Sequence, residues 1–259
     1  MARPSSATKA AIGTSIAGGA LSALSNAPLQ FGHLFRGRFP TVAVTGMTGV
    51  GKTRLADRLA RRASVDSTVD VGSATMERRT RKTAKGRGFR FRVVPGDNAA
   101  TRLSALDEVF HDDPVDGVLH VVAYGHATPR ANSTGGSSRE ELLSAELEDF
   151  AITAHRIASM AVRRDKPVWL VIVVTKTDLY GDDLDEAVRY YSPGSGSPFA
   201  AKVDELRSLA GGARLSVDVV PMYTEAVTTT GKEKRNAERG STELLGRLEA
   251  RMAQLSGHV

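Results

Sequence analysis

Two kinds of segment alternate along the chain. Short β-branched runs, several of them apolar at nearly every position, are typical of parallel strands that helices cover on both faces. These runs lie at residues 41–45, 89–94, 117–123, 168–174 and 217–220. Segments with apolar residues at helical spacing separate them, at 53–63, 99–110, 138–163, 199–209 and 242–255. The alternation predicts an α/β fold of three layers, a mostly parallel sheet between two layers of helices.

The remaining stretches predict loops and one extension. Residues 126–138, 192–198 and 228–241 are rich in Gly, Ser, Thr or charged residues and are interpreted as loops. With 259 residues, 41% of them hydrophobic, one large domain over 38–259 can bury a sizeable core. Residues 1–37 form an N-terminal extension of small apolar residues, helical or disordered.

The extension is a poor membrane span, because Gly, Ser, Asn26 and Pro28 interrupt its apolar run over residues 10–29. This favours a helix packed on its own domain or a disordered tail over docking to a partner or a membrane. The chain has no cysteine, which excludes disulfides, thiolate catalysis and cysteine-ligated zinc. Without a convincing signal peptide, we expect a cytoplasmic protein.

The positive charge is concentrated in one stretch. Residues 76–92 (MERRTRKTAKGRGFRFR) hold eight Lys or Arg against one Glu, a local charge of +7 in a chain of net charge +6. Phe89 and Phe91 alternate with Arg90 and Arg92, which predicts a strand, and residues 85–88 (KGRG) fit a hairpin turn before it. The segment Arg78 to Arg92 is either a charged edge that prevents aggregation or a docking face for RNA or an acidic partner.

The stretch GMTGVGKT follows one strand-like run, precedes a helix-like run and satisfies the pattern G-x-x-x-x-G-K-[ST]. Its glycines let the backbone aim N–H groups at phosphate oxygens, and the following helix N-terminus adds partial positive charge. Lys52 is placed to reach the β and γ phosphates, and the Thr53 hydroxyl to ligate Mg²⁺. The predicted nucleotide contacts are Gly46, Met47, Thr48, Gly49, Val50, Gly51, Lys52 and Thr53.

A second motif, Thr175-Lys176-Thr177-Asp178, ends the apolar run VWLVIVV. With the phosphate loop, it resembles the [NT]-K-x-D motif of the P-loop GTPases of the Ras-like and Era-like kind, the translation-factor-related class. The resemblance implies that Asp178 accepts from guanine N1–H and the 2-amino group, and that Lys176 lies along the base plane. Adenine offers neither donor, so the carboxylate would discriminate by about 10⁴ to 10⁵. The resemblance therefore implies GTP or GDP with Mg²⁺, and a base site that includes Thr175.

In the same resemblance a switch threonine caps Mg²⁺ and the γ-phosphate. Thr75 lies 23 residues after Lys52 and 21 before Gly96 and is our candidate, with Thr68 and Thr80 as rivals. The family's last base-contacting motif would fall at residues 223–226 (YTEA), where the match is confined to one or two residues.

The Asp-x-x-Gly motif of such GTPases corresponds to residues 93–96 (VVPG). Gly96 is predicted to donate its N–H to the γ-phosphate, but Val93 stands where the family has the acid that holds a Mg²⁺-bound water. Asp97 takes the position of the water-orienting residue, where its carboxylate would either orient water or hold the metal. Lys52, Thr75 and Asp97 are therefore the predicted catalytic set, and Thr53 and Thr75 the metal contacts.

These residues predict a GTP-binding switch with slow, partner-stimulated hydrolysis. One alternative is a module that binds nucleotide without turnover, for which Val93 argues. The other is a P-loop ATPase or kinase in which the TKTD sequence is accidental.

Overall fold

The computed structural model describes residues 39–60, 76–82, 88–96, 99–127, 137–222 and 232–257. The predicted N-terminal extension, 1–37, lies outside these residues, and so do Thr68, Thr75 and Asp97 and the segment 223–226. Within the described residues, no helix combines the length and hydropathy that a bilayer span needs.

Six strands form one sheet in the order β2-β3-β1-β4-β5-β6. All neighbouring pairs are parallel except β2 and β3, which form the antiparallel hairpin expected from the alternating Phe and Arg residues. The strands are β1 (Thr41–Thr45), β2 (Glu77–Lys82), β3 (Gly88–Val93), β4 (Gly117–Val122), β5 (Val168–Val174) and β6 (Leu215–Pro221).

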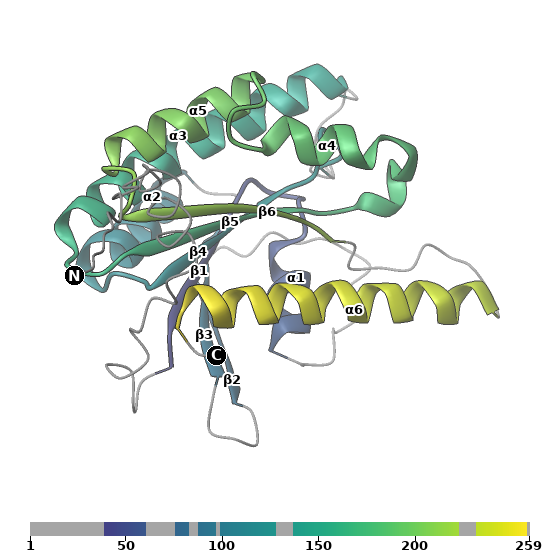
Figure 1. Ribbon diagram of the computed structural model, residues 1–259, viewed down its shortest axis with the longest axis horizontal. Helices are drawn as coiled ribbons and strands as arrows, with labels where there is room; N and C mark the ends of the chain where they lie inside the picture. Colours follow the sequence, from purple (N-terminus) through teal and green to yellow (C-terminus); the bar gives the residue numbers. More distant parts are fainter. Residues whose placement is uncertain are drawn as a thin grey trace, which may run out of the picture.

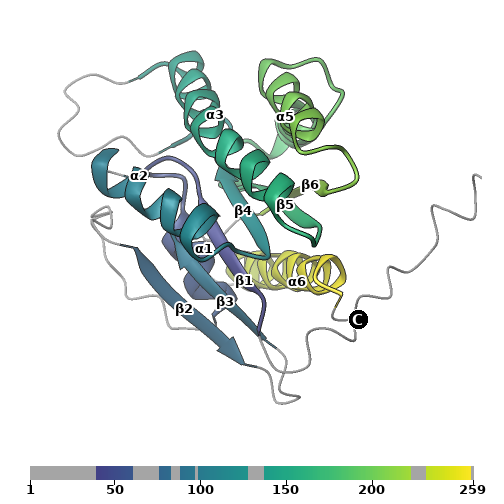
Figure 2. The ribbon, with the colours of Figure 1, turned by 90° about the vertical axis from the view of Figure 1, so that its left-hand side faces the viewer.

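Helices cover both faces of this sheet. The helices are α1 (Lys52–Leu59), α2 (Ala99–Asp107), α3 (Arg139–Arg163), α4 (Leu184–Tyr191), α5 (Pro198–Leu209) and α6 (Lys232–Leu255). α2, α3, α4 and α5 lie on one side of the sheet, and α1 and α6 on the other (Figure 1). The view in Figure 2 shows α6 across the sheet from α3 and α5. The predicted three-layer α/β architecture is confirmed.

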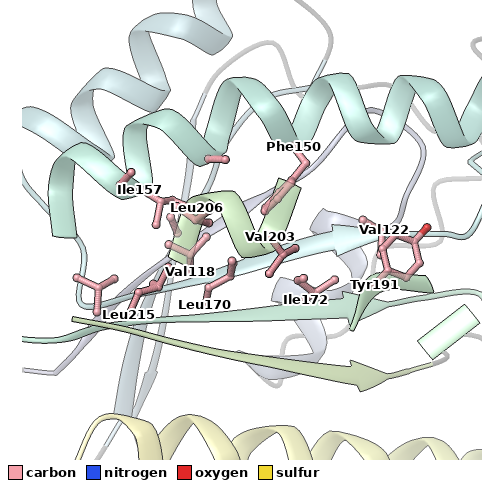
Figure 3. Close-up of a cluster of buried hydrophobic side chains, with 14 of the residues drawn as sticks. Val118, Val122, Phe150, Ile157, Leu170, Ile172, Tyr191, Val203, Leu206 and Leu215 are labelled. Atoms are coloured by element: carbon pink, nitrogen blue, oxygen red, sulfur yellow. The ribbon is translucent and has the colours of Figure 1, made fainter. Parts of the chain in front are cut away.

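The larger core lies between the sheet and the layer that contains α3 and α5. Phe150 of α3 and Leu206 of α5 point toward side chains of β4 and β5, among them Val118 and Ile172 (Figure 3). Every residue of β5 is buried, because the strand has helices on both faces. A second cluster on the opposite face joins Leu55 and Leu59 of α1 with Leu248 and Met252 of α6.

Local capping explains where two helices begin. The Ser138 hydroxyl accepts from the Glu141 N–H at 3.2 Å, and the Glu141 carboxylate accepts from the Ser138 N–H at 2.9 Å. This reciprocal pair fixes the start of α3. Ser197 accepts from the Ala200 N–H at 2.9 Å, ahead of Pro198 in the first turn of α5. Each cap contributes about 1 kcal/mol.

Two elements differ from the sequence-based expectation. α4 was not predicted. Its eight residues, LDEAVRYY, bury only Ala187 and Tyr191, and the segment is too short for a helical period to be recognised. α6 begins at Lys232, whereas residues 228–241 were predicted to form a loop. The polar sequence KEKRNAERG shows no apolar stripe, but most of its residues have high helix propensity and continue the helix that packs on the sheet.

We expect Gly117→Ala to destabilise the fold. A Cβ atom at Gly117 would lie 2.0 Å from the ring of buried Trp169, its partner on β5. Overpacking of this kind costs about 1–3 kcal/mol, measurable by urea unfolding. Gly246→Ala, on α6 with no atom within 4 Å, is the control and should stabilise by about 0.5–1 kcal/mol. Equal stability of Gly117→Ala and the wild type would contradict the close packing of β4 on β5.

Candidate nucleotide-binding site

The phosphate loop lies between β1 and α1, as its motif requires. Gly46, Gly49 and Gly51 have positive φ angles of 128°, 80° and 95°, which suit glycine and curl the backbone back toward the helix. A Cβ atom at Gly46 would also lie 2.2 Å from the Val121 carbonyl oxygen of β4. The close approach of two backbones therefore requires glycine at the first position of the motif. The chain has a three-layer P-loop NTPase fold.

Lys52 opens α1 and points into the curve of this loop. Its side chain is buried, and its Nζ donates to the Met47 carbonyl oxygen at 2.8 Å. The ammonium group is thereby held among the loop's backbone groups, beside the N-terminus of the helix. A positive charge and a helix N-terminus at one place favour the binding of a phosphate group.

The segment after β3 lies directly against the phosphate loop. Val94 donates its N–H to the Val44 carbonyl oxygen of β1 at 2.9 Å, which extends the pairing of β3 with β1. A Cβ atom at Gly96 would lie 2.4 Å from Thr48 Oγ1 and 2.9 Å from Lys52 Nζ. Gly96 is therefore next to the ammonium group that would hold the terminal phosphates.

Val93 occupies the position of the missing acid. Its side chain is buried in the cluster that also contains Val50 and Leu55, on the α1 face of the sheet. Within the described parts of the chain, no group of three His, Asp or Glu side chains could hold a metal ion. Asp57, one turn after Thr53 on α1, is engaged by Arg79, whose Nε lies 2.7 Å from Asp57 Oδ1.

A Mg²⁺ ion at this site would therefore depend on few protein ligands. Among the described residues, the Thr53 hydroxyl is the oxygen that the motif predicts as a Mg²⁺ ligand. The other ligands would be waters and phosphate oxygens, as is usual for Mg²⁺. The donor set fits a nucleotide-bound Mg²⁺ rather than a metal held by the protein alone.

The Thr175–Asp178 turn is tied to the phosphate loop by Thr175. The fully buried Thr175 hydroxyl lies 2.7 Å from the Val50 carbonyl oxygen and 2.8 Å from the Val122 carbonyl oxygen, and its N–H also donates to Val122. Its single proton can be donated to either carbonyl. The turn after β5 is thereby held beside a loop 125 residues earlier in the chain.

Lys176 and Asp178 complete this turn. Lys176 has a φ of 59°, an uncommon left-handed conformation for a residue with a side chain. The Leu179 N–H donates to the Lys176 carbonyl oxygen at 2.9 Å and closes the turn. Asp178 is exposed, so its carboxylate is open to a ligand.

Of the rival switch threonines, Thr80 lies within β2, opposite Arg90.

Three ionisable residues near the phosphate loop, His120, Arg102 and Asp149, were not predicted from the sequence, because no motif contains them. His120 of β4 is buried, and its Nδ1 lies 3.0 Å from Thr45 Oγ1 at the end of β1. Burial, with the positive charges of Arg102 and Lys52, lowers the pKa of His120 to about 3. Arg102 of α2 also forms an ion pair with Asp149 of α3 at 2.5 Å, where burial raises the pKa of the Asp149 carboxyl.

Comparisons with known proteins identify no family. No family model and no curated protein matches the chain. Among solved structures, the chain is similar to a dimerisation-deficient mutant of Toc33 from Arabidopsis thaliana, with a TM-score of 0.47 and 14% identity over 85% of each chain. The fold assignment rests on the sheet topology and the phosphate loop described above.

We expect Gly96→Ala to weaken binding of a nucleoside triphosphate more than that of the diphosphate. The new methyl group would meet Thr48 and Lys52, so the segment after β3 must move away from the terminal phosphate. A clash of about 1–3 kcal/mol corresponds to roughly 5- to 150-fold in affinity. Calorimetric titration of both nucleotides measures the ratio. Gly246→Ala is the control, and equal losses for both nucleotides would contradict a role for Gly96 at the terminal phosphate.

We expect His120 to make the fold sensitive to acid. Its pKa is about 6.5 when unfolded and about 3 when folded, so its contribution is complete above pH 6.5 and is lost as the pH falls toward 3. Between pH 7 and pH 4 the unfolding free energy should fall by roughly 3 kcal/mol more in the wild type than in His120→Asn. Urea unfolding at both pH values measures this. Parallel pH profiles for the two proteins would contradict a buried neutral imidazole.

Proposed function

We propose that the chain is a GTP-binding protein that acts as a nucleotide-dependent switch, with slow, partner-stimulated GTP hydrolysis. The observation that carries the proposal is the contact of the Thr175 hydroxyl with the Val50 carbonyl oxygen. It holds the Thr175–Asp178 turn beside the loop of residues 46–53. Two motifs that are far apart in the sequence would thus contribute to one nucleotide site.

The phosphate half of the site uses the backbone and one cation. N–H groups of residues 46–53 and the N-terminus of α1 would bind the β and γ phosphates together with Lys52. The Thr53 hydroxyl would hold Mg²⁺, which neutralises charge on the phosphate oxygens. The base half uses Asp178, whose exposed carboxylate would accept from N1–H and the 2-amino group of guanine.

The switch would depend on the terminal phosphate. Gly96 lies beside Lys52, and Asp97 is the next residue in the sequence, two positions before the start of α2. In the sequence, Thr75 precedes the first residue of β2 by two positions, and Asp97 follows the last residue of β3 by four. A γ-phosphate with Mg²⁺ would draw them together, and its loss would release them.

Hydrolysis would be slow because Val93 cannot hold the metal-bound water. Asp97 is our candidate for orienting the attacking water, and a partner would supply further transition-state stabilisation. Val93 also favours a second candidate function, a module that binds GTP without turnover. A GTP hydrolysis assay on the purified chain, with and without candidate partners, separates the two functions.

The partner surface that we propose is the β2–β3 hairpin. Arg79 and Arg92 are held by the acidic side chains of Asp57 and Asp113, whereas the side chain of Arg78 is 71% exposed even though it pairs with Glu108. Arg90 is exposed on β3. An acidic protein surface or RNA fits these charges, and the salt dependence of binding would be steeper for RNA.

We expect Asp178→Asn to exchange guanine preference for xanthine preference. Xanthine carries an oxygen where guanine has its 2-amino group, which matches an amide donor in place of a carboxylate acceptor. Calorimetry measures the affinities for GTP, XTP and ATP. The wild type should bind GTP most tightly, and the variant should bind XTP most tightly. In each protein the preferred nucleotide of the GTP–XTP pair should bind at least about tenfold more tightly than the other.

Matched variants control this experiment. Asp182→Asn changes an exposed carboxylate close by in the sequence and should leave the order unchanged. Lys52→Ala should abolish binding of all three nucleotides, because it removes the cation inside the phosphate loop. Equal affinity of the wild type for GTP and ATP would refute the GTP-binding proposal and favour an ATPase.

A further inference from the structure

Glu146 is a buried carboxylate that none of the predicted roles uses. It lies on α3 with 1% of its surface exposed, beside the end of β4. Its Oε1 accepts from the Ala123 N–H at 2.9 Å, and its Oε2 accepts from the Tyr191 hydroxyl of α4. No Lys or Arg of the described segments pairs with it. A buried carboxylate without a cation is costly, so its hydrogen bonds require a reason.

These hydrogen bonds hold the turn that follows β4. Tyr124 and Gly125 both have positive φ angles, 50° and 74°, which is uncommon for tyrosine. The Tyr124 N–H donates to the Tyr191 hydroxyl at 3.1 Å, so two successive N–H groups of the turn bond to Glu146 and Tyr191. Such buried backbone donors would otherwise be left without acceptors.

The turn after β4 contacts the turn after β5 at two points. The Tyr124 ring packs on the Tyr180 ring, with centroids 5.5 Å apart, and the Tyr180 hydroxyl donates to the Thr175 carbonyl oxygen at 2.5 Å. Burial, with the negative charges of Glu146 and Asp178, raises the pKa of Tyr180, so its hydroxyl remains a donor. At the second point, the His126 ring stacks on the Tyr180 ring, with centroids 5.0 Å apart.

A carboxylate meets this arrangement better than its amide. Both oxygens of Glu146 face donors, and the Tyr191 hydroxyl uses its proton toward Glu146 and a lone pair toward Tyr124. Glutamine would offer one acceptor oxygen and one NH₂ donor, so either the Tyr191 hydroxyl or the Ala123 N–H would face the NH₂ group without an acceptor. Burial raises the pKa of Glu146 to about 6, although hydrogen bonds from Tyr191 and from the backbone of Ala123 and Gly125 lower it. The carboxyl group is therefore ionised at pH 7.5.

We propose that Glu146, acting with Tyr191, is a positioning residue for base recognition. It touches no nucleotide; it fixes the turn after β4, which in turn fixes the Thr175–Asp178 turn relative to the phosphate loop. The inference rests on the proposed function, because it takes Asp178 as the guanine contact. It assigns a part in base selection to residues of α3 and α4, which lie outside both the phosphate loop and the Thr175–Asp178 motif.

The test separates base recognition from phosphate binding. Inorganic tripolyphosphate engages the phosphate loop but carries no base, so its affinity serves as the internal reference. In Tyr191→Phe and in Glu146→Gln, GTP affinity should fall about tenfold while tripolyphosphate affinity stays within about twofold. Amide hydrogen exchange should also show faster exchange at Ala123 and Tyr124 in both variants.

Tyr190→Phe is the matched control. It removes a hydroxyl from the adjacent residue of α4, which packs on Tyr124 at 5.7 Å between ring centroids. It should change neither affinity. Equal losses of GTP and tripolyphosphate affinity in Tyr191→Phe would show a general structural role and overturn the inference.

Two further outcomes separate this inference from the proposed function. Unchanged GTP affinity in Tyr191→Phe, with a wild type that prefers GTP to ATP, would overturn the inference alone. A wild type that binds GTP no better than ATP would overturn the proposed function and the inference with it.

Discussion

The hydroxyl of Thr175 is the interaction on which the site depends. It lies between two buried carbonyl oxygens, one from Val50 in the phosphate loop and one from Val122 at the end of β4. β1, β4 and β5 are adjacent and parallel, so their carboxyl ends meet at one edge of the sheet, where open α/β sheets bind ligands. The hydroxyl fixes the distance between the two loops at this edge, and would therefore set the span between the phosphates and the base of a nucleotide bound as we propose.

The surroundings of the phosphate loop favour an anion. The Lys52 ammonium lies within the loop, while His120 below it remains neutral because burial and nearby positive charge lower its pKa. Gly96 approaches the same ammonium, so a terminal phosphate would touch the segment that leads into α2. The ion pair of Arg102 with Asp149 then connects α2 to α3, on the opposite face of the sheet from α1. Val93, packed in the core, accounts for the slow chemistry that we propose.

Much of the fold could be predicted because its signals are local. A strand such as β5, buried on both faces, appears in the sequence as an unbroken apolar run, and the phosphate loop as glycines at fixed spacing. The first half of α6 could not be predicted, since its helix continues from a packed segment rather than from its own apolar pattern. α4 was too short to be recognised.

The long-range contacts of the site were hidden for a different reason. Glu146 with Tyr191, Arg102 with Asp149, and Thr175 with Val50 each join residues between 45 and 125 positions apart. No local pattern marks such a pair before the sheet brings its members together. The same holds for the basic stretch, whose Arg79 is neutralised by Asp57 of α1.

The most direct test is a crystal structure of the chain with Mg²⁺ and a non-hydrolysable GTP analogue. We expect the phosphates in the curve of residues 46–53, beside Lys52 Nζ, and the Asp178 carboxylate within hydrogen-bond distance of guanine N1 and N2. Thr175 should keep its contact with Val50. A nucleotide bound elsewhere, or a base that makes no contact with Asp178, would contradict the account.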